Sequence, residues 1–250
     1  TMSAEMKRPS SRVTLEDGRF ISADIVVANA DASNVYQHLL SPVAQQRTAS
    51  ARKSLAKATP SLSGFVILQA MSGKTPDFEH HNVFFPENYE DEFDSIFGIG
   101  KKVSPVSDPT IYICSPNDSR MVPTGNESWF MLINSPRHNP AEGIDWSDSK
   151  LKADYTKQIL SILAQRGFET SDRSIWQQTV TPADLEVNTL APGGSIYGTS
   201  SNGMRSAFLR PENVTKIPNL YLVGGSSHPG GGLPLVGMSA EIVARRIGRA

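Results

Sequence analysis

The residues best suited to chemistry lie in one glycine-rich segment near the carboxyl end of the chain. Seven of the eleven residues from Gly224 to Pro234 are glycine or proline, and they lie between the apolar run 219–223 and a helical pattern. Glycines allow positive φ and lack a Cβ, so a ligand can approach the main chain closely. A helix that begins there offers free N–H groups and a partial positive charge. A phosphate or another anionic group suits such a place, although a surface turn without a ligand has the same composition.

No other nucleotide or catalytic motif in the sequence is complete. The run 98–103 begins as Gly-x-Gly-x-x-Gly and fails at its last position. Walker-type, Gly-x-Ser-x-Gly and His-Glu-x-x-His motifs do not occur, so the sequence contains no motif of these classes that would name a catalytic residue.

The histidines and the cysteine do not form a metal-binding motif in the sequence. His80 and His81 have no third ligand nearby, and adjacent residues of a strand point to opposite faces, so we expect a solvated or loop pair. Cys114 is the one cysteine of the chain, which excludes an internal disulfide. We expect it to be a buried, inert thiol and predict no bound metal.

Two further polar groups lie in or near the glycine-rich segment. The ring of His228 can bond the backbone or face a ligand, and a structural role weighs at least as much as proton transfer. Arg205 and Arg210 could meet phosphate or ribityl oxygens, but we expect a solvated pair of arginines.

The elements that must position these residues alternate between strands and helices. Asp17–Gly18 is a typical hairpin turn. The apolar run 25–27 predicts a strand that is buried on both faces. Residues 29–31 end this strand, and a short helix is expected after them. The clearest helix covers 148–167, and a second buried strand over 219–223 leads into the glycine-rich segment. We therefore predict a mixed α/β fold.

Size and charge exclude several classes of protein. The chain has 250 residues, and 24 Lys and Arg against 25 Asp and Glu give a net charge of −1, so there is no overall attraction to nucleic acid. The apolar runs are far shorter than the roughly 18 residues of a membrane span. The first residues carry charge without an apolar core after them, so we expect no signal peptide and a cytoplasmic protein.

The order of these motifs resembles that of a known family. The matching segments run through almost the whole chain: 15–19, 23–31, 81–85, 108–113, 181–184, 219–225, 228–232 and Pro234. Together they resemble the phytoene desaturase-like family of FAD-dependent carotenoid oxidoreductases, which contains desaturases and oxygenases.

This resemblance implies the carboxyl-terminal half of an FAD-linked, amine-oxidase-like fold. Residues 1–40 would be the late strands of a partial FAD-binding domain, 41–217 a substrate-binding domain with a mixed sheet, and 218–250 the return to the FAD-binding domain. The first Rossmann βαβ unit with its dinucleotide fingerprint does not occur in this sequence. We therefore expect a missing N-terminal half, from the same gene or a second chain, to complete the cofactor site.

The function implied by the resemblance is the removal of hydride from a carotenoid or another long apolar isoprenoid, with FAD as cofactor. Oxygenation of such a substrate at its terminus is the other reaction that the resemblance implies. The alternative is a non-catalytic module of the same fold that binds a lipid or isoprenoid and does not hold FAD by itself. Substrates that dissolve in lipid also imply peripheral membrane contact. The cofactor-binding residues implied by the resemblance are Asn29, Ala30, Gly224, Gly225, His228, Pro229, Gly230, Gly231, Gly232, Leu233 and Pro234.

Overall fold

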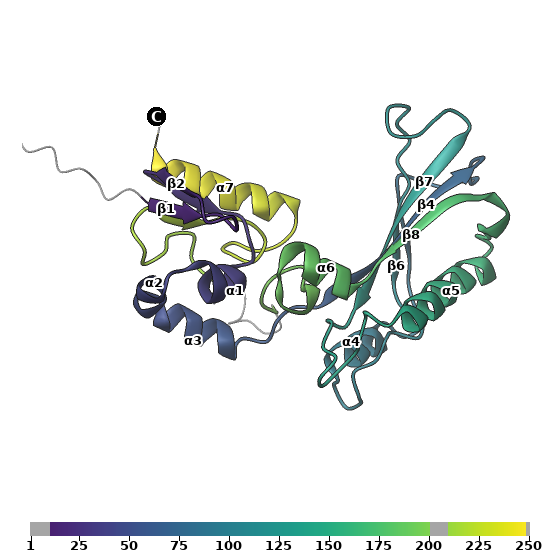
Figure 1. Ribbon diagram of the computed structural model, residues 1–250. Helices are drawn as coiled ribbons and strands as arrows, with labels where there is room; N and C mark the ends of the chain where they lie inside the picture. Colours follow the sequence, from purple (N-terminus) through teal and green to yellow (C-terminus); the bar gives the residue numbers. More distant parts are fainter. Residues whose placement is uncertain (1–10, 201–209, 249–250) are drawn as a thin grey trace, which may run out of the picture. The chain divides into compact units, whose positions relative to one another are not determined.

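The computed structural model of the protein describes residues 11–200 and 210–248 and contains two compact units (Figure 1). The split unit comprises the described residues up to Ser61 together with those from Tyr197 onward, and the central unit is Leu62–Ile196. Both units combine strands with helices, which confirms the predicted mixed α/β fold.

The split unit contains a hairpin, a pair of parallel strands and several helices. Their bounds are β1 (Ser11–Thr14), β2 (Phe20–Ala23), β3 (Val26–Ala28), α1 (Ala32–Asn34), the π-helical turn η1 (Val35–Leu39), α2 (Pro42–Arg47), α3 (Ala49–Lys57), β9 (Leu220–Leu222) and α7 (Leu233–Ile247).

The hairpin forms where the Asp17–Gly18 pair predicts it. Strands β1 and β2 are antiparallel, and the N–H of Leu15 donates to the carbonyl of Arg19 across the turn (2.7 Å). Gly18 has φ 84°, a backbone conformation that favours glycine. The predicted hairpin is confirmed.

Strand β3 pairs in parallel with β9, with Val27 opposite Tyr221. On the covered side Leu222 packs into a cluster with Val35 and Tyr36. The prediction that this strand is buried on both faces is wrong, because Val27 is 46% exposed. In the part of the chain that the structure describes, the pair has no third strand and only one face is packed.

The unit boundaries lie some way from the predicted domain boundaries at 40/41 and 217/218. The structure divides the chain after Ser61 and after Ile196. One reason is α3, where Leu55 packs on the cluster that contains Leu222. Another is Arg210, whose guanidinium bonds the glycine-rich segment. Residues on both sides of the predicted boundaries thus share contacts.

The central unit is an antiparallel sheet of order β5-β6-β7-β4-β8 with helices around it. No helix in the described ranges is both long and apolar enough to span a membrane. The bounds are β4 (Ser63–Ser72), β5 (His81–Phe84), α4 (Tyr89–Phe97), β6 (Ile111–Cys114), β7 (Asn126–Ser135), α5 (Ser149–Gln165), η2 (Ser171–Arg173), β8 (Ser174–Val180), α6 (Pro182–Thr189) and η3 (Pro192–Gly194).

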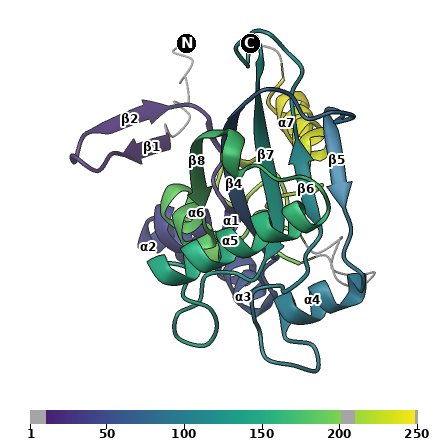
Figure 2. The same cartoon turned by 90° about the vertical axis from the view of Figure 1, so that its right-hand side faces the viewer.

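Helix α5 covers one face of this sheet (Figure 2). Its Tyr155, Ile159 and Leu163 recur at helical spacing and pack on fully buried side chains such as Phe65 of β4 and Met131 of β7. The predicted helix over 148–167 is confirmed, with the Asp148 side chain accepting a bond from the N–H of Lys150 at its start. This packing makes α5 and the sheet one hydrophobic core.

Substitution of Ile159 tests this core. Ile159→Ala removes a fully buried side chain and is expected to lower the free energy of unfolding by about 2–5 kcal/mol, measured by denaturant titration. Lys157→Ala, on the exposed side of the same helix, is the control and should change the free energy of unfolding by less than about 0.5 kcal/mol. Equal effects of the two substitutions would contradict the packing of α5.

Candidate functional site

The turns that follow β3 and β9 meet at the carboxyl edge of the parallel pair. The N–H of Val223 donates to the carbonyl of Ala28 (3.0 Å), and Gly224 follows with φ 106°. A Cβ at Gly224 would lie 2.5 Å from Oδ1 of Asn29. The close approach therefore requires glycine. Two of the predicted cofactor-binding residues, Asn29 and Gly224, are brought together.

The first of these turns continues into α1. The Asp31 side chain accepts a hydrogen bond from the N–H of Ser33 (2.8 Å) and caps the helix. Burial raises the pKa of Asp31, although hydrogen bonds from Ser33 and Asn34 act in the opposite direction. The N–H of Ala32 donates to the Ser226 hydroxyl (2.9 Å), which ties α1 to the glycine-rich segment.

A buried polar network holds the glycine-rich segment in shape. The Asn213 amide donates to the carbonyls of Leu222 (3.0 Å) and His228 (2.8 Å) and to the Ser239 hydroxyl (2.9 Å). The Ser227 hydroxyl donates to the carbonyl of Gly224 (3.0 Å). No motif in the sequence predicts this network. One signal was available: Ser239 lies on the buried stripe of α7 with Val243, and a polar group placed there must be hydrogen-bonded.

Arg210 also supports the segment. Its guanidinium donates to the carbonyls of Tyr197 (2.6 Å) and Gly225 (3.0 Å), and burial lowers its pKa. A Cβ on Gly230 would lie 3.2 Å from its Nε. The expectation of a solvated arginine is wrong for Arg210, because the side chain is half-buried against main-chain carbonyls. Arg205 lies outside the described residues.

Helix α7 begins at the end of the segment with a bare N-terminus. Its N-cap is Gly232, with φ 95°, and no side chain of the described residues caps it. Pro234 lies in its first turn, and Leu233 is 89% exposed. A Cβ on Gly232 would meet no atom within 4 Å. The free N–H groups and the helix dipole favour an anionic group here.

The remaining predicted site residues have other surroundings. Ala30 packs against the core cluster of the split unit, and a Cβ on Gly231 would overlap the ring of Tyr197. His228 has an exposed side chain, its main chain makes the hydrogen bonds to Pro211 and Asn213, and it is followed by half-buried Pro229. Ala30 and Gly231 therefore have packing reasons independent of any ligand.

The central unit presents a second surface, the sheet face opposite α5. We call it the open sheet face and define it by cross-strand rows, whose members share a face because they pair directly. The rows are Val180–Val66–Leu132–Tyr112–Val83, Gln178–Leu68–Phe130–Cys114–His81 and Trp176–Ala70–Ser128.

The open sheet face is largely apolar and accessible. Trp176 is 50% exposed, Val83 47% and Phe130 40%. Large exposed apolar side chains that share one face of a sheet point to a binding surface.

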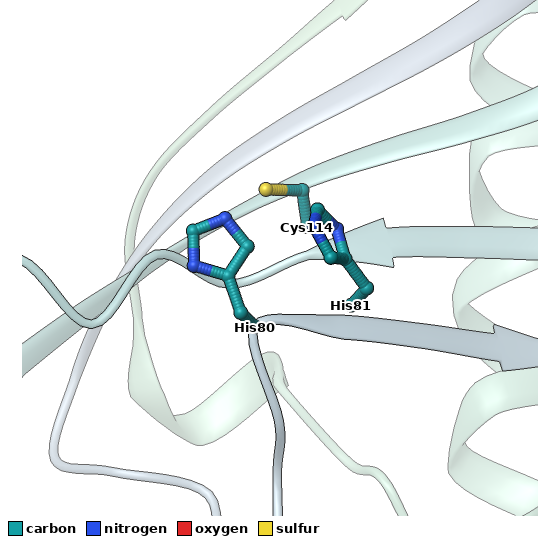
Figure 3. A group of neighbouring side chains, drawn as sticks. All are labelled: His80, His81 and Cys114. Carbon is teal, nitrogen blue, oxygen red and sulfur yellow. The ribbon is translucent and has the colours of Figure 1, made fainter.

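His80, His81 and Cys114 lie together at the β5 edge of this face (Figure 3). One ligand atom from each lies within 4.8 Å of the others. The prediction that the histidines lack a third ligand is wrong, because β5–β6 pairing sets His81 opposite Cys114. Cys114 is half-buried, not fully buried as expected. Desolvation raises the pKa of neighbouring Tyr112, and Cys114 raises it further.

The turns of two parallel strands meet at one edge, and the second turn leads into a helix with a bare N-terminus. Proteins with α/β folds that bind nucleotides use this arrangement at their cofactor sites. The chain belongs to the family of flavin-containing amine oxidoreductases, whose model matches residues 4–248.

Individual relatives agree with this family. A 1-hydroxycarotenoid 3,4-desaturase from Flavobacterium sp. is 36% identical over 93% of this chain and 45% of the relative. A 4,4'-diaponeurosporene oxygenase from Staphylococcus aureus is 32% identical over 94% and 46%. The chain thus spans less than half the length of these curated relatives.

A solved structure shares the fold. The crystal structure of an oxidoreductase from Methanosarcina mazei has a TM-score of 0.53 at 13% identity, covering 94% of this chain and 48% of that one. Like the two curated relatives, that protein is about twice as long as the chain.

Two glycines on either side of the start of α7 test the packing of the glycine-rich segment. Gly231→Ala would overlap the Tyr197 ring and is expected to lower the free energy of unfolding by about 1–3 kcal/mol. Gly237→Ala meets nothing within 4 Å inside the helix and should raise it by about 0.5–1 kcal/mol. Thermal or denaturant unfolding separates the two, and a neutral Gly231→Ala would contradict the contact.

Proposed function

We propose that this chain forms the carboxyl-terminal half of an FAD-dependent oxidoreductase that acts on a carotenoid or another long apolar isoprenoid. The observation that carries the proposal is the meeting of Asn29 and Gly224 at the carboxyl edge of the β3–β9 pair, in the unit that also contains the bare N-terminus of α7. The relatives named as a carotenoid desaturase and an oxygenase support the class of substrate.

The residues present fit the flavin. Asn29 and Gly224, which meet at this edge, and the neighbouring Gly225 would contact the pyrophosphate and ribityl chain. Gly232, Leu233 and Pro234 would hold the ring system at the bare start of α7, where the partial positive charge favours an anionic group. When bound, FAD supplies the acceptor for hydride, and the chain contributes alignment and a dry environment.

The open sheet face suits the substrate. Three of its large exposed side chains, Trp176, Phe130 and Val83, are apolar and suit a polyene without polar groups. We assign the substrate role to the central unit and the flavin role to the split unit. Because such substrates dissolve in lipid, we also propose that the protein contacts the membrane peripherally. We place the protein in the cytoplasm. We further propose that an N-terminal half completes the FAD site.

One observation favours a second candidate function, a module that binds a lipid or isoprenoid without FAD. The open sheet face is built entirely from the central unit, so it requires no cofactor. A gene product that is colourless and takes up no FAD, yet binds a carotenoid, would support this second function over the first.

Substitution of Gly224 tests the cofactor site in the complete gene product. Gly224→Ala places a methyl group against Asn29 at positive φ and is expected to weaken FAD binding about tenfold or more, measured by flavin fluorescence titration. Gly125→Ala has the same kind of backbone strain, with φ 80° and open space around it, in the central unit. It should leave FAD affinity unchanged.

A double variant separates contact from strain by its effect on stability. Asn29→Ala together with Gly224→Ala removes the contact with Oδ1 and should recover part of the free energy of unfolding that Gly224→Ala loses. If Gly224→Ala binds FAD as tightly as the wild type, or if Gly125→Ala loses as much, the cofactor assignment fails.

The substrate surface is tested on β8. Trp176→Asp puts a charge on the open sheet face and is expected to reduce binding of a detergent-solubilised acyclic carotenoid about tenfold or more, measured by co-elution of its absorbance. Gln177→Asp alters the next residue, which is exposed and pairs with Gln69 on the opposite face of the sheet. Carotenoid binding should survive that control, and equal losses would contradict the assignment.

A further inference from the structure

The cluster of His80, His81 and Cys114 lies at the β5 edge of the open sheet face, and the proposed function gives these three side chains no role of their own. His81 begins β5, and Cys114 ends β6 directly opposite it. Directly paired residues on neighbouring strands share a face, so the imidazole and the thiol project to the same side. Figure 3 shows the two imidazoles and the sulfur gathered there.

His80 joins the cluster because the chain bends before β5 begins. Its carbonyl accepts a hydrogen bond from the N–H of Ser115 (2.9 Å), which holds the main chain of His80 against the end of β6. The rings of His80 and His81 meet edge to face with centroids 4.4 Å apart. Adjacent residues thus serve one site, whereas a regular strand would have separated them.

Tyr112 orients one of the ligands. Its hydroxyl lies 2.8 Å from Nδ1 of His81, and the two rings stack with centroids 5.9 Å apart. A hydrogen bond at one imidazole nitrogen fixes the ring and leaves the other, Nε2, available to a metal. The tyrosine is on the same strand and the same face as Cys114.

We infer that His80, His81 and Cys114 form a binding site for a divalent ion of the zinc class, with the fourth coordination position open. Two imidazoles and a thiolate suit Zn²⁺ and related ions better than Mg²⁺ or Ca²⁺, which prefer oxygen. Bonds of about 2.0–2.3 Å place tetrahedral ligand atoms roughly 3.3–3.8 Å apart. The ligand atoms lie within 4.8 Å of one another, and small side-chain adjustments on metal binding close the difference.

Binding involves a simple exchange. The Cys114 thiol releases its proton to solvent as the sulfur–metal bond forms, and each histidine ligates as neutral imidazole. Three protein ligands leave one position for water or an added ligand, as in zinc sites that are not purely structural. This inference does not depend on the proposed flavin function.

The test is a titration of the purified protein with Co²⁺ and Zn²⁺. Co²⁺ should bind one ion per chain and give thiolate-to-cobalt charge-transfer absorption, and Zn²⁺ should abolish that absorption by competition. Cys114→Ser is expected to remove the absorption and weaken Zn²⁺ binding about tenfold or more in calorimetry. His80→Ala and His81→Ala should each weaken it to a similar degree.

Two variants serve as controls. His38→Ala alters an exposed histidine of the split unit and should leave Zn²⁺ affinity unchanged. Tyr112→Phe keeps all three ligands and should weaken binding by up to about tenfold. Circular dichroism confirms that each variant is folded.

The inference is overturned if Co²⁺ binds without the charge-transfer absorption, if Cys114→Ser binds Zn²⁺ like the wild type, or if the folded protein binds neither ion.

Discussion

The pairing of β3 with β9 is the contact on which the rest of the split unit depends. The two strands have three residues each, yet their turns join positions 194 residues apart, as the bond from Ala32 to Ser226 shows. Parallel neighbours cannot be joined by a tight turn and need a crossover. Here the crossover contains the whole central unit. Loss of this short pairing would separate Asn29 from Gly224.

So short a ladder needs support from side chains, and the buried polar residues provide it. Asn213 bonds the end of β9, the main chain of His228 and helix α7 through a single amide. Arg210 joins the carbonyls of two turns. Buried groups of this kind are costly unless fully bonded. The glycine-rich segment is therefore held in one conformation by hydrogen bonds from Asn213 and Arg210 to its main-chain carbonyls.

The sequence predicts most of the local structure. It predicts only part of the contacts that depend on the pairing of strands. The hairpin at Asp17–Gly18 and helix α5 follow from turn chemistry and helical periodicity, which short segments contain. The cluster at His80 and Cys114 arises from strand pairing and from a bend before β5, and neither is visible in one segment. Val27 is more exposed than its apolar neighbours predict, because apolar composition does not say whether a covering strand is present.

The glycines show a related ambiguity. Gly231 and Gly232 are adjacent and look alike in the sequence, but the first lies against the Tyr197 ring and the second faces open space. One is explained by packing, and the other is free to accept a ligand. The residue type indicates a close approach without saying whether the approaching group is another part of the chain or a ligand.

The order of the segments along the chain also has a consequence for synthesis. The central unit is continuous, so all its strands leave the ribosome before β9 does. Domains fold largely as units during translation. The antiparallel sheet can therefore form early, while β3 pairs with β9 only after β9 has emerged. Contacts with such wide sequence separation also form slowly, so the pairing that closes the split unit is a late event in the folding of this chain.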